Sequence, residues 1–329
     1  MTIMPAVTLI EAVTMALAYE LEHDSNVVLL GEDIGVNGGV FRATAGLQQR
    51  FGKDRVIDTP LAESMIAGLS VGMSTQGMKP VAEIQFLGFI FSALDQLFTQ
   101  AARMRNRTRG RLSCPMVVRA PYGGGIHAPE HHSESTEALY AHIPGLKVVI
   151  PSNPSRAYGL LLAAIRDPDP VIFLEPKRVY RLVKHEVEDN GEAYPLETCF
   201  VDREGTDITL ISWGAMMHET LQAADELAKE GISAEVIDVA TVAPLDVQTL
   251  VESVAKTGRA LIVQEAPKSG AIGSEIAAEL SEKAIMHLLA PIGRVSGYDT
   301  VMPYYKLEKK YMPSVQRIVS KAKELMEYV

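Results

Sequence analysis

Residues 147–174 read KVVIPSNPSRAYGLLLAAIRDPDPVIFL, and this stretch decides the fold. Two short apolar runs, 147–150 and 171–174, flank a longer segment that predicts a helix. The turn at residues 151–154 supplies Asn153 and Pro154, residue types that open helices. A strand, a helix and a second strand in this order are typical of a parallel pair joined by a crossover.

The same alternation extends in both directions along the chain. Before residue 147 the sequence predicts strands at 27–30, 80–86 and 116–119, and helices at 8–22 and 89–105. After residue 205 it predicts strands at 208–211, 234–239, 260–263 and 294–295, separated by helices. Residues 175–205 are charged and irregular between these halves. We therefore expect an α/β protein with a domain at 1–180, a linker at 181–205 and a smaller α/β domain at 206–329.

Composition narrows the classes of function. The 329 residues carry a formal net charge of −10, so no overall field attracts nucleic acid or an anionic membrane surface. Two cysteines form no disulfide framework and no metal-site spacing. We see no signal peptide and no apolar run of about 20 residues, so we expect a cytoplasmic protein that contacts neither membrane nor nucleic acid.

Glu63 is a candidate for proton chemistry. It follows Asp58-Thr59-Pro60-Leu61-Ala62 at the expected start of a helix, which Pro60 is predicted to open. An apolar stretch follows it, and a carboxylate aimed into packed apolar surroundings is costly without a partner. The alternative is a first-turn acid that complements the helix dipole. Gly68 and Gly72 share one helix face, where another backbone or a flat ligand could approach.

A glycine- and histidine-rich loop follows the strand at 116–119. Residues 120–135 read APYGGGIHAPEHHSES and include His127, His131 and His132. Consecutive glycines allow close backbone approach, and a histidine exchanges protons near neutral pH. A surface loop and a metal site are the alternatives, although no carboxylate motif completes a zinc ligand set.

Three further segments have weaker signals. Gln85, Phe86 and Phe89 could wall a flat aromatic ligand or belong to the core. Arginines alternate from residue 103 to residue 111, which indicates a solvated face or a contact with a partner subunit. The turn at residues 164–170 could ring a cation, or simply connect a helix to a strand.

Together these segments resemble the β subunit of the E1 component of 2-oxo acid dehydrogenase complexes, of the pyruvate or branched-chain type. The resemblance covers nearly the whole chain and rests on motifs that occur in the family order: LLGEDIG (29–35), VIDTPLAES (56–64), EIQFLGF (83–89), the histidine loop, GLKVVIPSNP (145–154), AAIRDPDPVIFLEPKRVYR (163–181) and TVAPLD (241–246). It implies a transketolase-like pyrimidine-binding domain, a parallel sheet with helices on both faces, followed by a transketolase C-terminal domain.

The resemblance also implies cofactors and partners. Thiamine diphosphate would be shared with an α subunit that holds the diphosphate and Mg²⁺, because this chain has no Gly-Asp-Gly…Asn motif. The chain would be inactive alone and would act in an α₂β₂ heterotetramer that serves the E2 acyltransferase. Its reaction would be oxidative decarboxylation of a 2-oxo acid and reductive acylation of the lipoyl group of E2.

The resemblance also implies roles for individual residues of this chain. Glu63 matches the glutamate that bonds N1′ of the aminopyrimidine, and Gln85 and Phe89 match the lining of the pyrimidine pocket. His132 matches a histidine at the active-site mouth, placed to act in reductive acylation. A structural potassium site, built largely from backbone carbonyls, matches Met116, Ala164, Ile165, Asp167 and Asp169.

One position departs from part of the family. Leu289 stands before Ala290-Pro291, where some relatives carry an acid tied to E2 docking. Pyruvate is the favoured substrate and a branched-chain 2-oxo acid the alternative. A split transketolase-like subunit and a non-catalytic binding protein are further alternatives, and Glu63 together with His132 argues against the last.

Overall fold

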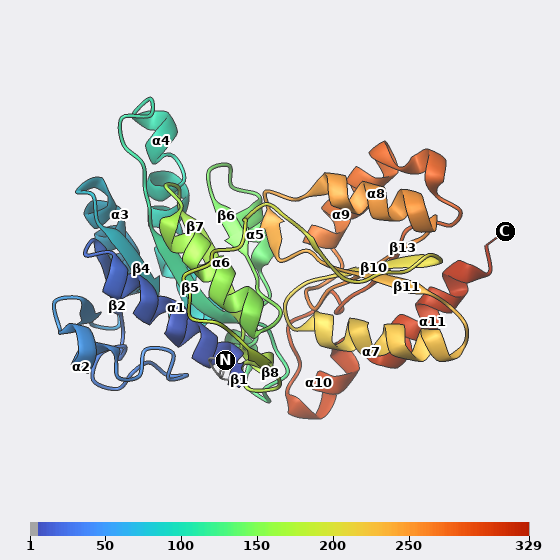
Figure 1. The fold of residues 1–329 in the computed structure, drawn as a ribbon, viewed down its shortest axis with the longest axis horizontal. Coiled ribbons are helices and arrows are strands. Elements are labelled where there is room, and N and C mark those ends of the chain that lie inside the picture. Colours follow the sequence, from blue (N-terminus) through green and yellow to red (C-terminus); the bar gives the residue numbers. More distant parts are fainter. Residues whose placement is uncertain (1–5, 329) are drawn as a thin grey trace. The chain divides into compact units, whose positions relative to one another are not determined.

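The computed structural model describes residues 6–328 (Figure 1). They form two compact units. The first contains residues up to Tyr122 together with Leu139–Leu196, and the second contains Gly123–Ala138 together with the chain from Glu197 onward. The loop with the three histidines therefore belongs to the second unit, although its sequence lies within the first. The expected boundaries at 180 and 205 remain a prediction.

The first unit is built on a parallel sheet, as expected. Its neighbouring strands run in the order β6 (Lys147–Val149), β7 (Val171–Pro176), β5 (Val117–Tyr122), β4 (Lys79–Glu83), β2 (Val27–Gly31) and β3 (Val56–Asp58). Its central strands are buried along their length, as crossovers covered by helices require.

Local sequence signals position the helices of this unit. Helix α1 (Leu9–His23) begins with a capping box between Thr8 and Glu11, and α6 (Pro154–Arg166) begins at Pro154 behind the Asn153 cap. The two helices pack side by side (Figure 1), and α3 (Glu63–Thr75) packs against β4.

The predicted helix at 89–105 is wrong in detail. The segment divides into a 3₁₀ helix, η1 (Leu87–Ala93), a π-helical turn, η2 (Gln96–Ala101), and the short α4 (Met104–Arg107). The Thr99 hydroxyl donates to the Asp95 carbonyl at 2.7 Å, and such back-bonding competes with regular helical geometry. The strand expected to end at Phe86 ends at Glu83.

The second unit has a five-stranded sheet in the order β14 (Gly293–Val295), β13 (Ala260–Val263), β10 (Ile208–Ser212), β11 (Ala234–Asp238) and β9 (Phe200–Arg203). Strand β9 is antiparallel to β11, and the other pairings are parallel. The accompanying helices are α7 (Met216–Lys229), α8 (Val247–Thr257), α9 (Ile272–Lys283), α10 (Tyr305–Tyr311) and α11 (Val315–Met326). Apolar residues of β10, β11, α7 and α11 share one core.

Candidate functional site

Glu63 is the first residue of α3, and its N-cap is Ala62. Pro60 therefore lies before the helix and does not open it, which corrects the expectation from the sequence. The surroundings of Glu63 are also less closed than expected. Ile66 and Ala67 are buried, but Met65 is 42% exposed in this chain.

A second carboxylate lies near Glu63. Glu32 directly follows β2, and its partial burial and the charges of Asp33 and Glu63 raise its pKa. A carboxyl group whose pKa is raised by a negatively charged neighbour keeps its proton up to a higher pH. The end of β2 and the start of α3 thus bring two carboxylates close enough for their charges to interact.

Aromatic side chains lie in the same unit. Gln85 is half-buried after β4, and Phe89 lies in η1 with its ring edge-on to Phe86 at 5.6 Å. Phe86 in turn contacts Phe41, with ring centroids 5.3 Å apart. A carboxylate, an amide and half-buried aromatic rings are the groups that an aminopyrimidine ring requires, so these residues fit that part of a thiamine cofactor.

The histidine loop has an unusual backbone. Gly123 and Gly125 have φ of +86° and +83°, and His127 has φ of +62°. His132 ends a short 3₁₀ turn, Glu130–His132, and is half-buried, whereas His131 is exposed. The structure therefore places His132 and His127 in the second unit, and Glu63, Gln85 and Phe89 in the first.

Two buried carboxylates hold this loop. Glu265, two residues after β13, accepts hydrogen bonds from the Gly124 amide and, at 2.8 Å, from the Ser135 hydroxyl. A Cβ on Gly123 would come within 2.7 Å of Glu265 Oε1, which explains the glycine there.

Glu308 of α10 is the second buried carboxylate. Its Oε1 accepts from the amides of Gly125 at 2.9 Å and His127 at 3.2 Å. Its Oε2 lies 2.7 Å from His127 Nδ1. Neither carboxylate could be assigned to the loop from the sequence, because Glu265 and Glu308 follow the loop by more than a hundred residues and belong to no local pattern.

Glu137 follows the same loop by two residues and begins the short helix α5 (Glu137–Ala141). It is fully buried, and its Oε1 accepts from Trp213 Nε1 at 3.3 Å. Burial, with the charge of Glu265 as a smaller contribution, raises the pKa of the Glu137 carboxyl from 4.5 to about 7. This unit therefore holds a carboxyl that titrates near neutrality.

The expected potassium residues lie around the end of α6. Asp167 Oδ2 is 2.7 Å from Lys147 Nζ, and Asp169 Oδ1 is 2.6 Å from Arg105 Nε. Each carboxylate is thus paired with a cationic side chain of this chain, Lys147 or Arg105. A cation in this turn would have to be held mainly by backbone carbonyls.

The local backbone suits that arrangement. The Ala164 carbonyl faces no helical donor four residues on, because residue 168 is proline. The Asp169 amide donates instead to Asp167 Oδ1 at 2.9 Å, so it is turned away from the Ile165 carbonyl. Met116 O accepts from the Val171 amide at 3.0 Å and retains a second lone pair.

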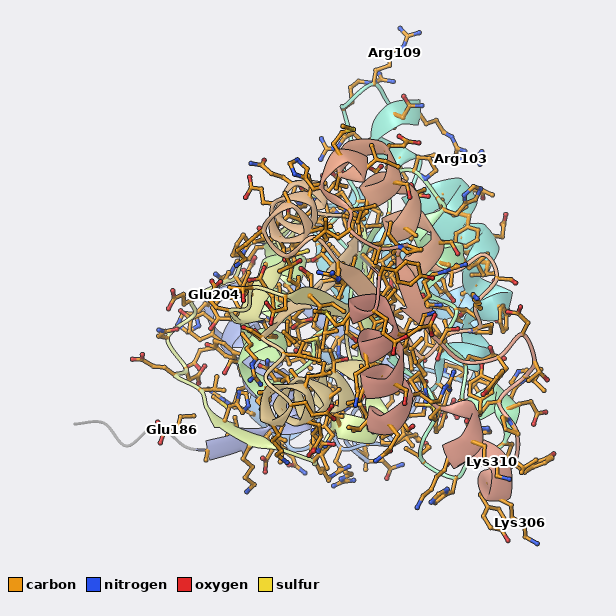
Figure 2. The ribbon with its side chains drawn as sticks, turned by 90° about the vertical axis from the view of Figure 1, so that its right-hand side faces the viewer. Arg103, Arg109, Glu186, Glu204, Lys306 and Lys310 are labelled. Atoms are coloured by element: carbon orange, nitrogen blue, oxygen red, sulfur yellow. The ribbon has the colours of Figure 1, made fainter. Side chains whose placement is uncertain are left out.

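The arginine-rich segment extends from the first unit. Arg105 bonds Asp169 and Arg107 bonds Gln100, whereas Arg103 and Arg109 point outward (Figure 2).

In the part of the chain that the structure describes, no helix is both long and apolar enough to cross a membrane. Within residues 6–328, no three side chains of His, Cys, Asp or Glu form a group that could hold a metal ion.

Both parts of the chain match models of known protein families. Residues 5–183 match the family model "Transketolase, pyrimidine binding domain", and residues 198–318 match "Transketolase, C-terminal domain". The chain is 51% identical over 325 residues to the pyruvate dehydrogenase E1 component subunit beta of Bacillus subtilis (strain 168), covering 99% of this chain and 100% of that protein. The chain belongs to the E1 β family.

Other E1 β relatives are similar over the same length. The subunits of Staphylococcus aureus (strain N315) and Staphylococcus epidermidis (strain RP62A) are each 49% identical over 325 residues, with 99% of this chain and 100% of each relative covered. A solved structure titled "Split gene transketolase, inactive beta4 tetramer" superposes with a TM-score of 0.77 over 98% of this chain and 99% of that one. At 22% identity this likeness concerns the fold alone. The transketolase-like fold and the E1 β resemblance expected from the sequence are thus confirmed.

Proposed function

We propose that this chain is the β subunit of a pyruvate dehydrogenase E1 enzyme. The enzyme would oxidatively decarboxylate pyruvate and reductively acylate the lipoyl group of E2. The observation that carries the proposal is the 51% identity to an E1 β subunit over 99% of the chain, and Glu63 lies close enough to Glu32 to raise the pKa of that carboxyl. An oxidoreductase of the 2-oxo acid dehydrogenase class (EC 1.2.4.-) is the corresponding activity.

Thiamine diphosphate, when bound, supplies the electron sink for decarboxylation. Glu63 would hold a proton between its carboxyl and N1′ of the aminopyrimidine, and Glu32 would keep that region able to retain the proton. Gln85 and Phe89 would orient the pyrimidine ring. The diphosphate and Mg²⁺ would be held by an α subunit, so the chain would act only in an α₂β₂ heterotetramer in the cytoplasm.

His132 would serve the second half of the reaction, at the mouth of the site where the lipoyl group arrives. A half-buried position on a glycine-rich loop supports that role. Potassium would bind the carbonyls of Met116, Ala164 and Ile165, with Asp167 and Asp169 fixing the turn through their ion pairs.

We place the E2 contact on the second unit. A groove of about 680 Å³ runs beside α9 and includes Ala290-Pro291, next to the position where Leu289 replaces the acid of some relatives. It is lined by Ser274, Ala277, Ser281, Ile285, Leu288, Ala290, Pro291, Ile292 and Arg294. Ile285 is 59% exposed, which supports an apolar contact with the subunit-binding domain of E2.

The decisive experiment replaces Glu63 in the enzyme reconstituted with its α subunit. We expect Glu63→Gln to lower pyruvate decarboxylation, followed with a dye acceptor, by about 100-fold or more, because proton transfer at N1′ is lost. Glu22→Gln is the matched control, since Glu22 lies on the surface of the same unit and pairs with Arg50. Near-wild-type decarboxylation by the Glu63 variant would falsify the assignment.

The same preparation separates the alternatives. Higher kcat/KM for 3-methyl-2-oxobutanoate than for pyruvate would favour the branched-chain enzyme. Ketol transfer between sugar phosphates without use of lipoyl-E2 would favour a split transketolase. Turnover by the β chain without its α subunit would contradict the shared site.

A further inference from the structure

The Glu308 carboxylate contacts the histidine loop through both of its oxygens. Its Oε1 accepts two backbone amides, those of Gly125 and His127, and its Oε2 meets the His127 ring at Nδ1. The Glu308 side chain is 3% exposed, whereas the His127 side chain is 59% exposed. The buried Glu308 carboxylate thus contacts one ring nitrogen of His127, and most of the His127 side chain is exposed to solvent.

This contact favours one tautomer of the neutral imidazole. An ionised carboxylate only accepts hydrogen bonds, so the bond at 2.7 Å places a proton on His127 Nδ1. The other ring nitrogen, Nε2, is then the atom that gains or releases a proton. A carboxylate that fixes the tautomer and orientation of a histidine in this way is a recurring arrangement in proton-transfer sites.

The backbone also indicates a constrained position. His127 has φ of +62°, a left-handed conformation that a non-glycine residue keeps only when its contacts hold it. Its ring lies edge-on to Tyr305, with centroids 6.3 Å apart, and Tyr305 begins the helix that carries Glu308. One short helix, α10, therefore fixes the backbone, the ring plane and the protonated nitrogen of His127.

We infer that Glu308 is a positioning residue for the reaction, acting through His127. It holds His127 with Nδ1 protonated and Nε2 outward, ready to donate or accept a proton during acyl transfer to the lipoyl group. This inference rests on the proposed function, and it adds a second histidine and its carboxylate partner to the step assigned to His132. Glu265 differs, because its contacts with Gly124 and Ser135 hold the loop through an amide and a hydroxyl.

A double-mutant cycle in the reconstituted α₂β₂ enzyme tests the inference. Glu308→Gln leaves an oxygen for the two amides but removes the carboxylate from His127. His127→Asn tolerates the left-handed backbone and lacks Nε2. We expect each single variant to lower acyl transfer to lipoyl-E2 about tenfold, to keep dye-coupled decarboxylation within about twofold, and the double variant to be no slower than His127→Asn.

Several outcomes would overturn it. Multiplicative losses in the double variant would mean that Glu308 does not act through His127. Equal losses in the lipoyl and dye assays would indicate a structural role alone, and no loss in either assay would remove the role. If wild-type enzyme decarboxylates no 2-oxo acid, the proposed function itself fails, which the wild-type assay reveals separately.

Hydrogen exchange of the full chain in complex with α provides a readout independent of activity. We expect Glu308→Ala to speed amide exchange in a peptide spanning residues 123–132 by about tenfold, and Glu308→Gln to change it by less than about twofold. Glu324→Gln, an exposed acid paired with Lys321 on α11, is the control for loss of charge. Unchanged exchange in Glu308→Ala would contradict the clamp even if that variant assembles poorly.

Discussion

At the scale of single residues, burial decides which carboxyl groups gain or lose a proton near neutral pH. Glu137 has its pKa raised to about 7 because its carboxyl is fully buried, and the Trp213 hydrogen bond only partly offsets this. The folded chain therefore binds a proton that the unfolded chain releases above about pH 4.5. Ionisation of Glu137 at neutral pH works against folding.

Glu137→Gln should change the dependence of stability on pH. In the wild-type chain the contribution of Glu137 is complete below pH 4.5 and is lost as pH rises toward its folded pKa of about 7. Between pH 5 and pH 7 this loss amounts to about 2 kcal/mol, from 1.36 kcal/mol per pKa unit. Thermal unfolding at both pH values should show a smaller decline for Glu137→Gln, whereas Glu282→Gln on the exposed face of α9 should follow wild type. Identical declines in all three proteins would refute the prediction.

Residues with a local signature can be selected from the sequence as candidates, and their roles stay predictions. Glu63 stands at a helix start and Gln85 follows a strand, so position alone indicated the strand-end edge where ligands bind. Glu265 and Glu308 were missed because their partners, the amides of the histidine loop, are distant in the sequence. Only tertiary structure shows which buried acid meets which loop.

At the scale of elements, three neighbouring strands are joined by a buried ion network. Arg119 of β5 bonds Glu175 of β7 through Nε at 2.6 Å and Nη2 at 3.0 Å, and Glu83 of β4 through Nη1 at 2.8 Å. Tyr180 donates to Glu175 at 2.6 Å. Burial raises the pKa of Glu83, while Arg119 opposes that change. One guanidinium thus binds two buried carboxyl groups and joins three neighbouring strands.

Arg119→Met should strongly destabilise the first unit. It leaves two buried carboxylates without their cation, and breaking a buried pair costs about 3–5 kcal/mol. Thermal unfolding should show a drop of several degrees or failure to fold, with Arg119→Lys intermediate. Arg50→Met, which breaks the surface pair with Glu22, should cost less than about 1 kcal/mol. Equal effects at positions 119 and 50 would refute the network's importance.

Strands and capped helices were predictable, and the irregular helices were not. The strands at 147–150 and 171–174 and the helix from Pro154 were correct, because caps and apolar runs act locally. The sequence predicts a single helix at residues 89–105. Its division into 3₁₀, π and α turns depends on back-bonding and packing that no residue pattern reports.

At the scale of the whole molecule, two exposed apolar surfaces are candidate contacts for the α subunit and E2 that we propose as partners. The first lies along α3 and the residues before it, where Leu61, Met65 and Leu69 are 69%, 42% and 43% exposed. The second adjoins the groove beside α9, with Ile285 59% exposed. Exposed apolar residues that gather on one surface are typical of interaction sites.

Reciprocal substitutions should separate the two partners. Met65→Glu should weaken assembly with the α subunit at least about tenfold and leave E2 binding by the assembled fraction unchanged, because a charge would be buried at the interface. Ile285→Glu should do the reverse. Analytical ultracentrifugation with α, followed by titration with the E2 subunit-binding domain, measures both. Loss of the same partner in both variants would contradict two separate surfaces.

The division into two units was the least predictable feature of the fold. Domain limits drawn along the sequence assume that each domain is one continuous stretch. Here Gly123–Ala138 leaves the first unit after β5, packs with the second, and the chain returns at Leu139. The glycine- and histidine-rich composition of this segment predicts a loop but not the unit to which it belongs, because its anchors are the distant carboxylates Glu265 and Glu308.

This excursion has a consequence for dissecting the protein. A gene fragment that starts at residue 197 would encode every strand of the second sheet and yet lack the loop whose amides cover two buried acids. Supplying residues 123–138 by circular permutation or as a separate peptide would restore those bonds. A fragment that preserves the second unit must therefore combine two separate stretches of the sequence. Recombination of genes between residues 183 and 198 would separate the loop from the carboxylates that bind it.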